Sequence, residues 1–218
     1  MSHVAGPTAA LAGIPGGIQS QGVWAGRRQL FVRFAAEAET ATMYTADALA
    51  NELRRSMSRS VFHSIAIAGR DPLANVEYLQ AAFKKIDTKL PVMLDTDGQR
   101  PDELGELKSV LQVAQVSLNG VTSEPAEERA FESIRVAKDA GLVHALVLSA
   151  DERVTDAHML RVVERAHVAS EATMVVIHPG PTTPVDRDRR WTTLLERASA
   201  LHGDVRLALK LPPPTGMR

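Results

Sequence analysis

The sequence predicts an α/β fold, a partial (β/α) barrel whose strands are mostly parallel. Short runs of aliphatic and β-branched residues alternate repeatedly with longer amphipathic segments along the chain. This alternation is typical of parallel strands that are joined by right-handed helical crossovers. The chain has 218 residues, fewer than most complete eight-unit barrels, so an open barrel in a single domain is favoured.

The first half of the chain contains expected strands that are short and apolar, as buried parallel strands are. They cover residues 29–35, 64–68 and 91–95. The amphipathic segments predict helices at residues 45–57 and 75–86. Thr45 can cap the first of these helices through its hydroxyl, and Leu49 and Leu53 lie on one face of it.

The second half repeats the pattern, and its apolar runs predict strands at residues 115–118, 143–149, 173–178 and 205–209. The segments between them predict helices at residues 102–111, 125–140, 155–170 and 189–201. Residues 1–17 are rich in Ala, Gly and Pro and lack both the basic start and the long apolar run of a signal peptide. We therefore expect a flexible N-terminal extension of residues 1–17, followed by one domain of residues 18–218.

Composition excludes several classes of protein. A formal net charge of −1 provides no basic field, so binding to nucleic acid or to a membrane is not expected. The chain has no cysteine, which excludes disulfides, cysteine nucleophiles and thiolate-bound metals, including cysteine-ligated iron–sulfur clusters. No stretch approaches the about 20 apolar residues that span a bilayer, so the cytoplasm is the expected location.

Candidate site residues are the polar residues at the ends of the expected strands, because parallel α/β folds bind ligands at the carboxyl ends of their strands. His178 ends an apolar strand and is the histidine best placed for acid–base chemistry, with a structural role as the alternative. Asp71 and Asp95 are candidate partner carboxylates. No Ser-His-Asp spacing, phosphate-binding loop or Gly-x-Gly-x-x-Gly motif supports a hydrolase, an NTPase or a dinucleotide-binding protein.

Four segments occur in an order that is typical of one enzyme family. Residues 17–22 read Gly-Ile-Gln-Ser-Gln-Gly, and a Gly-Arg pair and a Phe-Val-Arg strand at residues 31–33 follow them. Residues 68–72 read Ala-Gly-Arg-Asp-Pro, and residues 94–98 read Leu-Asp-Thr-Asp-Gly. Together they resemble motifs of 7-carboxy-7-deazaguanine synthase, a radical-SAM family of the queuosine pathway. The resemblance covers roughly residues 17–218.

The resemblance implies a partial barrel of the radical-SAM type that forms homodimers. It also implies substrate contacts from Gln19, Gln21, Arg33, Asp95 and Lys210. A degenerate SAM region would comprise Gly69, Arg70, Asp71 and Thr96. Other roles stay open: Arg33 can form a salt bridge with a carboxylate such as Asp95, and the two glutamines can bond to their own loop backbone.

The residues that hold the cluster in this family are missing from the chain. In the family, three cysteines follow the Phe-Val-Arg strand and bind a [4Fe–4S] cluster, whereas residues 36–43 contain none. Glu37 and Glu39 offer hard oxygen ligands that poorly replace soft thiolates. Arg70 stands where a family glycine makes room for SAM. We therefore expect no [4Fe–4S] cluster and no other cofactor, and Arg70 argues against SAM binding.

Two functional hypotheses follow. The main one is a pseudoenzyme that acts as a binding, accessory or regulatory protein. The alternative is a repurposed non-radical enzyme, of the lyase or transferase kind, that acts on a pterin, a deazapurine or another small heterocycle at the barrel mouth. In it, Arg33 would clamp an anion, His178 would be the general acid or base, and Asp71 or Asp95 would be its partner carboxylate. The expected partners are a small heterocyclic ligand and a second copy of the chain or an accessory protein.

Overall fold

The chain forms a mixed α/β fold around one ten-stranded sheet. The structure is a computed structural model that describes residues 6–150, 153–179 and 189–208. Its strands are β1 (Thr8–Gly13), β2 (Gly16–Ile18), β3 (Arg28–Phe34), β4 (Thr42–Thr45), β5 (Ser64–Gly69), β6 (Val92–Thr96), β7 (Val113–Asn119), β8 (Val143–Ser149), β9 (Met174–His178) and β10 (Val205–Leu207). Its helices are α1 (Ala46–Arg59), the short 3₁₀ helix η1 (Pro72–Asn75), α2 (Val76–Phe83), α3 (Pro101–Glu106), α4 (Glu124–Asp139), α5 (Asp156–Ala169) and α6 (Arg190–Leu201).

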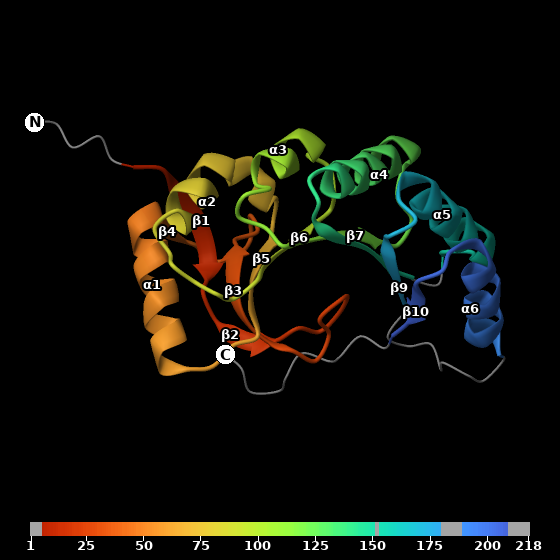
Figure 1. Cartoon of the computed structure of the whole chain (residues 1–218), viewed down its shortest axis with the longest axis horizontal. Helices are drawn as coiled ribbons and strands as arrows, with labels where there is room; N and C mark the ends of the chain where they lie inside the picture. Colours follow the sequence, from red (N-terminus) through yellow and green to blue (C-terminus); the bar gives the residue numbers. More distant parts are fainter. Residues whose placement is uncertain (1–5, 151–152, 180–188, 209–218) are drawn as a thin grey trace, which may run out of the picture.

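The sheet is mostly parallel and strongly curved. Its strand order is β10-β9-β8-β7-β6-β5-β3-β1-β4, and the strands from β3 to β10 run parallel to one another. β1 is antiparallel to both β3 and β4, and β2 is antiparallel to β3. Figure 1 shows the helices along the convex side of the sheet and the loop that joins β2 to β3 on its concave side. The two faces of the sheet therefore have different partners.

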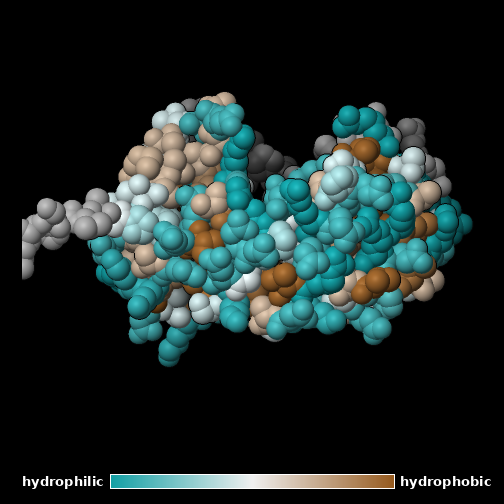
Figure 2. Space-filling view, turned by 90° about the horizontal axis from the view of Figure 1, so that it is seen from above, coloured by the Kyte–Doolittle hydropathy of each residue, from teal (hydrophilic) through white to brown (hydrophobic). Residues whose placement is uncertain are grey.

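Alternate strand residues face the helices and form the apolar core. Leu30, Val32 and Phe34 of β3 are buried in one cluster with Leu49 and Leu53 of α1. Strands β7 to β9 contribute to a second cluster, which packs against α4, α5 and α6. Full burial of one such side chain is worth about 1.5–3 kcal/mol. Figure 2 looks onto the helices from the convex side, where the surface is mostly hydrophilic and hydrophobic residues show only in small areas.

Most of the strands and helices predicted from the sequence are present, but the N-terminal region differs from the prediction. Residues 8–13 form β1, which is inserted between β3 and β4, and residues 16–18 form β2. Ala9 and Leu11 of β1 are buried, so this segment belongs to the core and is not a flexible extension. Ala and Gly hide the strand pattern here, since their small side chains carry little of the alternating signal. Strand β4 was not anticipated either.

None of the helices in the described ranges is long and apolar enough to cross a bilayer.

Tyr78 of α2 provides a test of the core. Its side chain is 2% exposed, and its hydroxyl has no hydrogen-bond partner among the described residues. Burial, with a smaller contribution from Tyr44, raises the pKa of Tyr78 above its usual range. The neutral phenol is therefore favoured in the folded state, and its contribution to stability is present below the unfolded pKa of about 10 and is lost as the pH rises above it.

Tyr78→Phe is expected to lose less stability than the parent between about pH 9 and pH 11, because it has no buried phenol to ionise. At neutral pH the variant is expected to be as stable as the parent or up to about 1 kcal/mol more stable, since an unpaired buried hydroxyl is removed. Urea unfolding of the parent and the variant, at neutral pH and between about pH 9 and pH 11, measures the difference. An alkaline loss in Tyr78→Phe as large as that of the parent would contradict this account.

Candidate functional site

The concave face of the sheet carries a group of polar side chains from four neighbouring parallel strands. Asp95 lies on β6, Gln115 and Ser117 on β7, Ser149 on β8, and His178 on β9. Their direct neighbours along each strand belong to the apolar clusters on the convex side, so alternation along the strand directs these side chains to the concave face. We call these five residues the concave polar cluster. Register places Asp95 beside Gln115 and Ser149 beside His178.

The cluster is well buried for polar groups. Gln115 is 0% exposed and His178 is 1% exposed, and Ser117 is also buried. The Ser117 hydroxyl donates a hydrogen bond of 2.6 Å to Asp95 Oδ1. Such a short bond to a carboxylate is typical of the stronger, charge-assisted class, so it holds these two side chains in one arrangement.

The β2–β3 loop covers the concave polar cluster. The Gly22 backbone N–H donates to His178 Nε2 at 3.1 Å, and the Val23 N–H donates to Gln115 Oε1, also at 3.1 Å. The loop is closed at its base, where Gln19 N–H donates to the Arg27 carbonyl and the Gly26 N–H donates to the Gln19 carbonyl. Two backbone donors thus dock the loop on the cluster.

The loop also has an apolar anchor. Trp24 packs with Phe31 against the buried residues Ala66, Met93 and Val113 of the concave face. Its ring meets His63 edge to face, with a centroid separation of 4.9 Å. The loop is therefore held on this face by apolar packing as well as by hydrogen bonds.

The hydrogen bond to His178 determines the state of its ring. Because the Gly22 N–H is the donor, Nε2 must present a lone pair, so the imidazole is neutral and carries its proton on Nδ1. A neutral Nε2 is the form that can accept a proton from a ligand. In this conformation, the loop occupies that lone pair.

Three buried polar atoms around the cluster have no hydrogen-bond partner among the described residues. They are Gln21 Oε1, which is an acceptor, Gln115 Nε2, which is a donor, and Ser149 Oγ, which can be either. Buried polar groups are hydrogen-bonded in the great majority of cases, because an unmade bond costs about 1–3 kcal/mol. These atoms therefore mark a place where a polar molecule would find partners.

The predicted SAM region lies elsewhere, at the carboxyl ends of β5 and β6. Gly69, Arg70 and Asp71 line a cavity of about 650 Å³. Arg70 forms an ion pair with Glu37 at 2.7 Å. The Thr96 hydroxyl is buried and accepts a hydrogen bond from the Gly98 N–H, so Thr96 stabilises its own turn.

The other predicted site residues have mixed placements. Arg33 pairs with Glu39 at 3.0 Å and is half exposed, so Asp95 is not its partner. Gln19 closes the base of the β2–β3 loop through its backbone, and Gln21 lies within that loop. Lys210 lies outside the described residues.

The structure thus brings Gln21, Asp95 and His178 to one face, and it adds residues that the sequence analysis missed. The missed residues are Gln115, Ser117 and Ser149. A local signal for them exists, because the first two stand at alternate positions of an otherwise apolar strand. That pattern predicts a polar face on the strand, but it does not predict which segment of the chain packs against that face.

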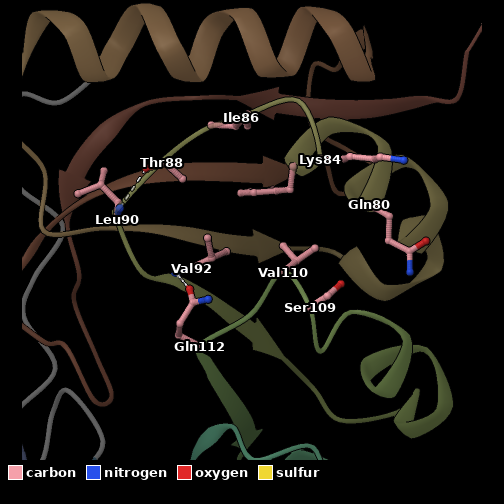
Figure 3. A pocket seen from close by; sticks show the side chains of 10 residues that line it. Gln80, Lys84, Ile86, Thr88, Leu90, Val92, Ser109, Val110 and Gln112 are labelled. Atoms are coloured by element: carbon pink, nitrogen blue, oxygen red, sulfur yellow. Dashed lines mark hydrogen bonds between the residues drawn. The ribbon is translucent and has the colours of Figure 1, made fainter.

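A further pocket of about 400 Å³ lies at the opposite edge of the sheet, where β6 and β7 begin. Figure 3 shows its lining, which mixes apolar side chains such as Ile86, Leu90 and Val110 with polar ones such as Lys84 and Ser109. Two of its polar side chains bond to nearby backbone: Gln112 Oε1 accepts from the Val92 N–H, and the Thr88 hydroxyl accepts from the Leu90 N–H. This edge is the amino end of the strands, away from the usual ligand site of parallel folds.

Within the described ranges, no group of three or more His, Cys, Asp or Glu side chains is placed to hold a metal ion.

Comparison with known proteins gives little similarity. No family model and no curated protein sequence matches the chain. Among solved structures, the apo form of the 3-keto-D-glucoside 4-epimerase YcjR from E. coli aligns with 81% of this chain and 77% of its own, at 18% sequence identity and a TM-score of 0.39. A similarity at this level carries no inference about what the chain binds.

The assignment to the 7-carboxy-7-deazaguanine synthase family is wrong. No family model supports it, and the chain lacks the cysteines that hold the cluster in that family. The motifs that suggested it coincide with turns that need glycine: Gly22, Gly69 and Gly98 all have positive φ angles. Glycine is the residue that readily adopts a positive φ, so turn geometry explains the matches at these positions. The interpretation as a radical-SAM-like pseudoenzyme is withdrawn with the family.

Proposed function

We propose that the protein is a non-radical enzyme that binds a small heterocycle at the concave polar cluster and transfers a proton through His178. The curved, mostly parallel sheet supports the interpretation as a partial (β/α) barrel, a fold whose chemistry is placed at the carboxyl halves of the strands. The observation that carries the proposal is a set of buried donor and acceptor atoms that have no hydrogen-bond partner among the described residues, on the concave face and in the loop that docks on it.

The proposed ligand has a lactam or amide edge, as pterins and purine-like heterocycles do. Such an edge presents one N–H donor beside one carbonyl acceptor. Gln21 Oε1 matches the donor and Gln115 Nε2 matches the acceptor. Both glutamines border Gly22: Gln21 precedes it in the chain, and Gln115 Oε1 lies 1.9 Å from the position that a Cβ on Gly22 would take.

The proposed chemistry is general acid–base catalysis by His178. Imidazole is the side chain best suited to proton transfer near neutral pH. Asp95, held by Ser117, supplies a carboxylate on the same face. Because the Gly22 N–H occupies His178 Nε2, the β2–β3 loop must release the ring before Nε2 can accept a proton from the ligand. The loop then acts as a lid over the site.

Titration calorimetry with pterin, guanine and 1-methylguanine tests the binding part of the proposal. Pterin and guanine are expected to bind, and 1-methylguanine is expected to bind about tenfold more weakly, since methylation removes the lactam N–H and leaves Gln21 Oε1 unpaired. Gln115→Ala is expected to weaken guanine binding. Gln80→Ala is the control, because Gln80 bonds to the Glu106 carbonyl far from the cluster. If neither pterin nor guanine binds, the proposal fails.

His178→Gln tests the proton-transfer part. The glutamine amide oxygen can still accept from the Gly22 N–H, so the fold and the docked loop are expected to persist. Incorporation of solvent deuterium into the bound heterocycle, followed by NMR and mass spectrometry, is expected to fall about 100-fold or more, the usual contribution of a general acid or base. Deuterium incorporation that is unchanged in His178→Gln would rule out this role.

A further inference from the structure

A second candidate site lies at the rim of the sheet. It is the cavity of about 650 Å³ at the carboxyl ends of β5 and β6, and none of its lining residues belongs to the concave polar cluster. Its lining includes three arginines, Arg70, Arg100 and Arg129, and two aspartates, Asp71 and Asp97. Cavities of this size and in this position are where parallel α/β folds bind small molecules.

One arginine is fixed by one aspartate. Arg100 Nε lies 2.8 Å from Asp71 Oδ1 and 3.0 Å from Oδ2, and Arg100 Nη2 lies 2.9 Å from Asp71 Oδ2. Arg100 also donates to Glu103 at 3.1 Å. The Asp71 carboxylate is thus paired with Arg100, so it does not neutralise the other two arginines.

The other two arginines can engage a ligand. The partner of Arg70 is Glu37, and their side chains are 56% and 82% exposed, so this ion pair is worth little and can be exchanged. Arg129 of α4 is exposed and has no ion pair or hydrogen bond within the described part of the chain. The Asp97 carboxylate accepts a hydrogen bond from the Gln99 N–H through Oδ1, so Asp97 stabilises its own turn. Among the residues that line the cavity, three guanidinium groups stand against two carboxylates.

The backbone around the cavity is unusual as well. Asp71 is a non-glycine residue in the left-handed region, with φ 43° and ψ 58°. Such a conformation costs about 1–3 kcal/mol and persists where the surroundings enforce it, often at ligand clamps. In this conformation the Asp71 carboxylate makes its three contacts with Arg100.

We propose that this cavity binds an oxyanion, the phosphate or carboxylate group of a small molecule, through Arg129 and Arg70, with Arg100 held in place by Asp71. Guanidinium groups bind such oxyanions through paired hydrogen bonds, and they bind phosphate with several donors at once. The inference goes beyond the proposed function, because it depends on neither His178 nor the heterocycle.

Titration with inorganic phosphate and, separately, with malonate tests it at constant ionic strength. Arg129→Ala is expected to weaken binding of the preferred anion tenfold or more, and Arg70→Ala is expected to weaken it as well. Lys138→Ala, which removes a positive charge from the last turn of the same helix, is expected to leave binding unchanged. Tighter phosphate binding would assign the site to phosphorylated ligands, and tighter malonate binding to carboxylates.

The outcomes separate this inference from the proposed function. Anion binding that persists in His178→Gln supports the rim site even if no heterocycle binds. Absence of saturable binding of either anion would overturn the inference, and so would an equal loss in Lys138→Ala, which would indicate unspecific attraction.

Discussion

Gly69→Ala is expected to destabilise the protein by about 2–4 kcal/mol, since it combines overpacking with a left-handed backbone. Gly69 ends β5 with a φ of +103°, and a Cβ there would lie 2.2 Å from the Phe34 carbonyl oxygen and 2.7 Å from the Phe34 nitrogen. Both contacts are backbone atoms of β3, whose Phe34 is the register partner of Gly69. A methyl group could fit only if two central parallel strands moved apart.

Gly141→Ala is the matched control for this prediction. Gly141 also has a positive φ, +71°, but nothing lies within 4 Å of its Cβ position. Its replacement is expected to cost only about 1–2 kcal/mol, the strain of the left-handed conformation. Urea unfolding of both variants measures the difference. Equal losses would mean that the contact with Phe34 does not contribute.

Gly22→Ala is expected to detach the β2–β3 loop from the concave polar cluster. Gly22 has a φ of +77°, and its Cβ would lie 1.9 Å from Gln115 Oε1. Gln115 is 0% exposed, so its side chain is enclosed and can move only if the residues around it move as well. The hydrogen bonds from Gly22 to His178 and from Val23 to Gln115 would then break, with an expected loss of about 1–3 kcal/mol of stability.

A double-mutant cycle checks this cause. Removing the Gln115 side chain clears the space, so Gly22→Ala in a Gln115→Ala background is expected to cost at least about 1 kcal/mol less than in the parent. Gly26→Ala is the control, because Gly26 lies in the same loop with a φ of +82° and nothing within 4 Å of its Cβ position. Trp24 fluorescence and limited proteolysis of the loop report its release. Additive effects of the two substitutions would refute the proposed clash.

Under the proposed function, the same variant changes ligand binding. An undocked loop no longer donates to His178 Nε2, so Gly22→Ala is expected to bind the heterocycle faster than the parent. Its ligand is also expected to dissociate faster, since the loop no longer closes over the site. Stopped-flow measurements with pterin separate the two rates.

Local pattern was sufficient for most of the parallel region. The apolar runs that end at Asp95 and His178 became β6 and β9, and the residues that follow strands do line the carboxyl edge. Strands β1 and β2 were not anticipated because Ala and Gly carry little strand signal. Arg33 pairs with Glu39 because the following loop turns back within reach, whereas the predicted partner Asp95 lies on β6, two strands away from β3.

The sequence by itself determined the α/β class, the alternation that makes the sheet parallel, and the chemistry that the absence of cysteine excludes. Only the tertiary structure decided which polar residues meet. Gly22 donates a hydrogen bond to His178, which lies 156 residues away in the chain. Ser117 donates one to Asp95 from the neighbouring strand. These contacts depend on strand order, register and the fold of one loop across the concave face, which arise from long-range packing and leave no local pattern in the sequence.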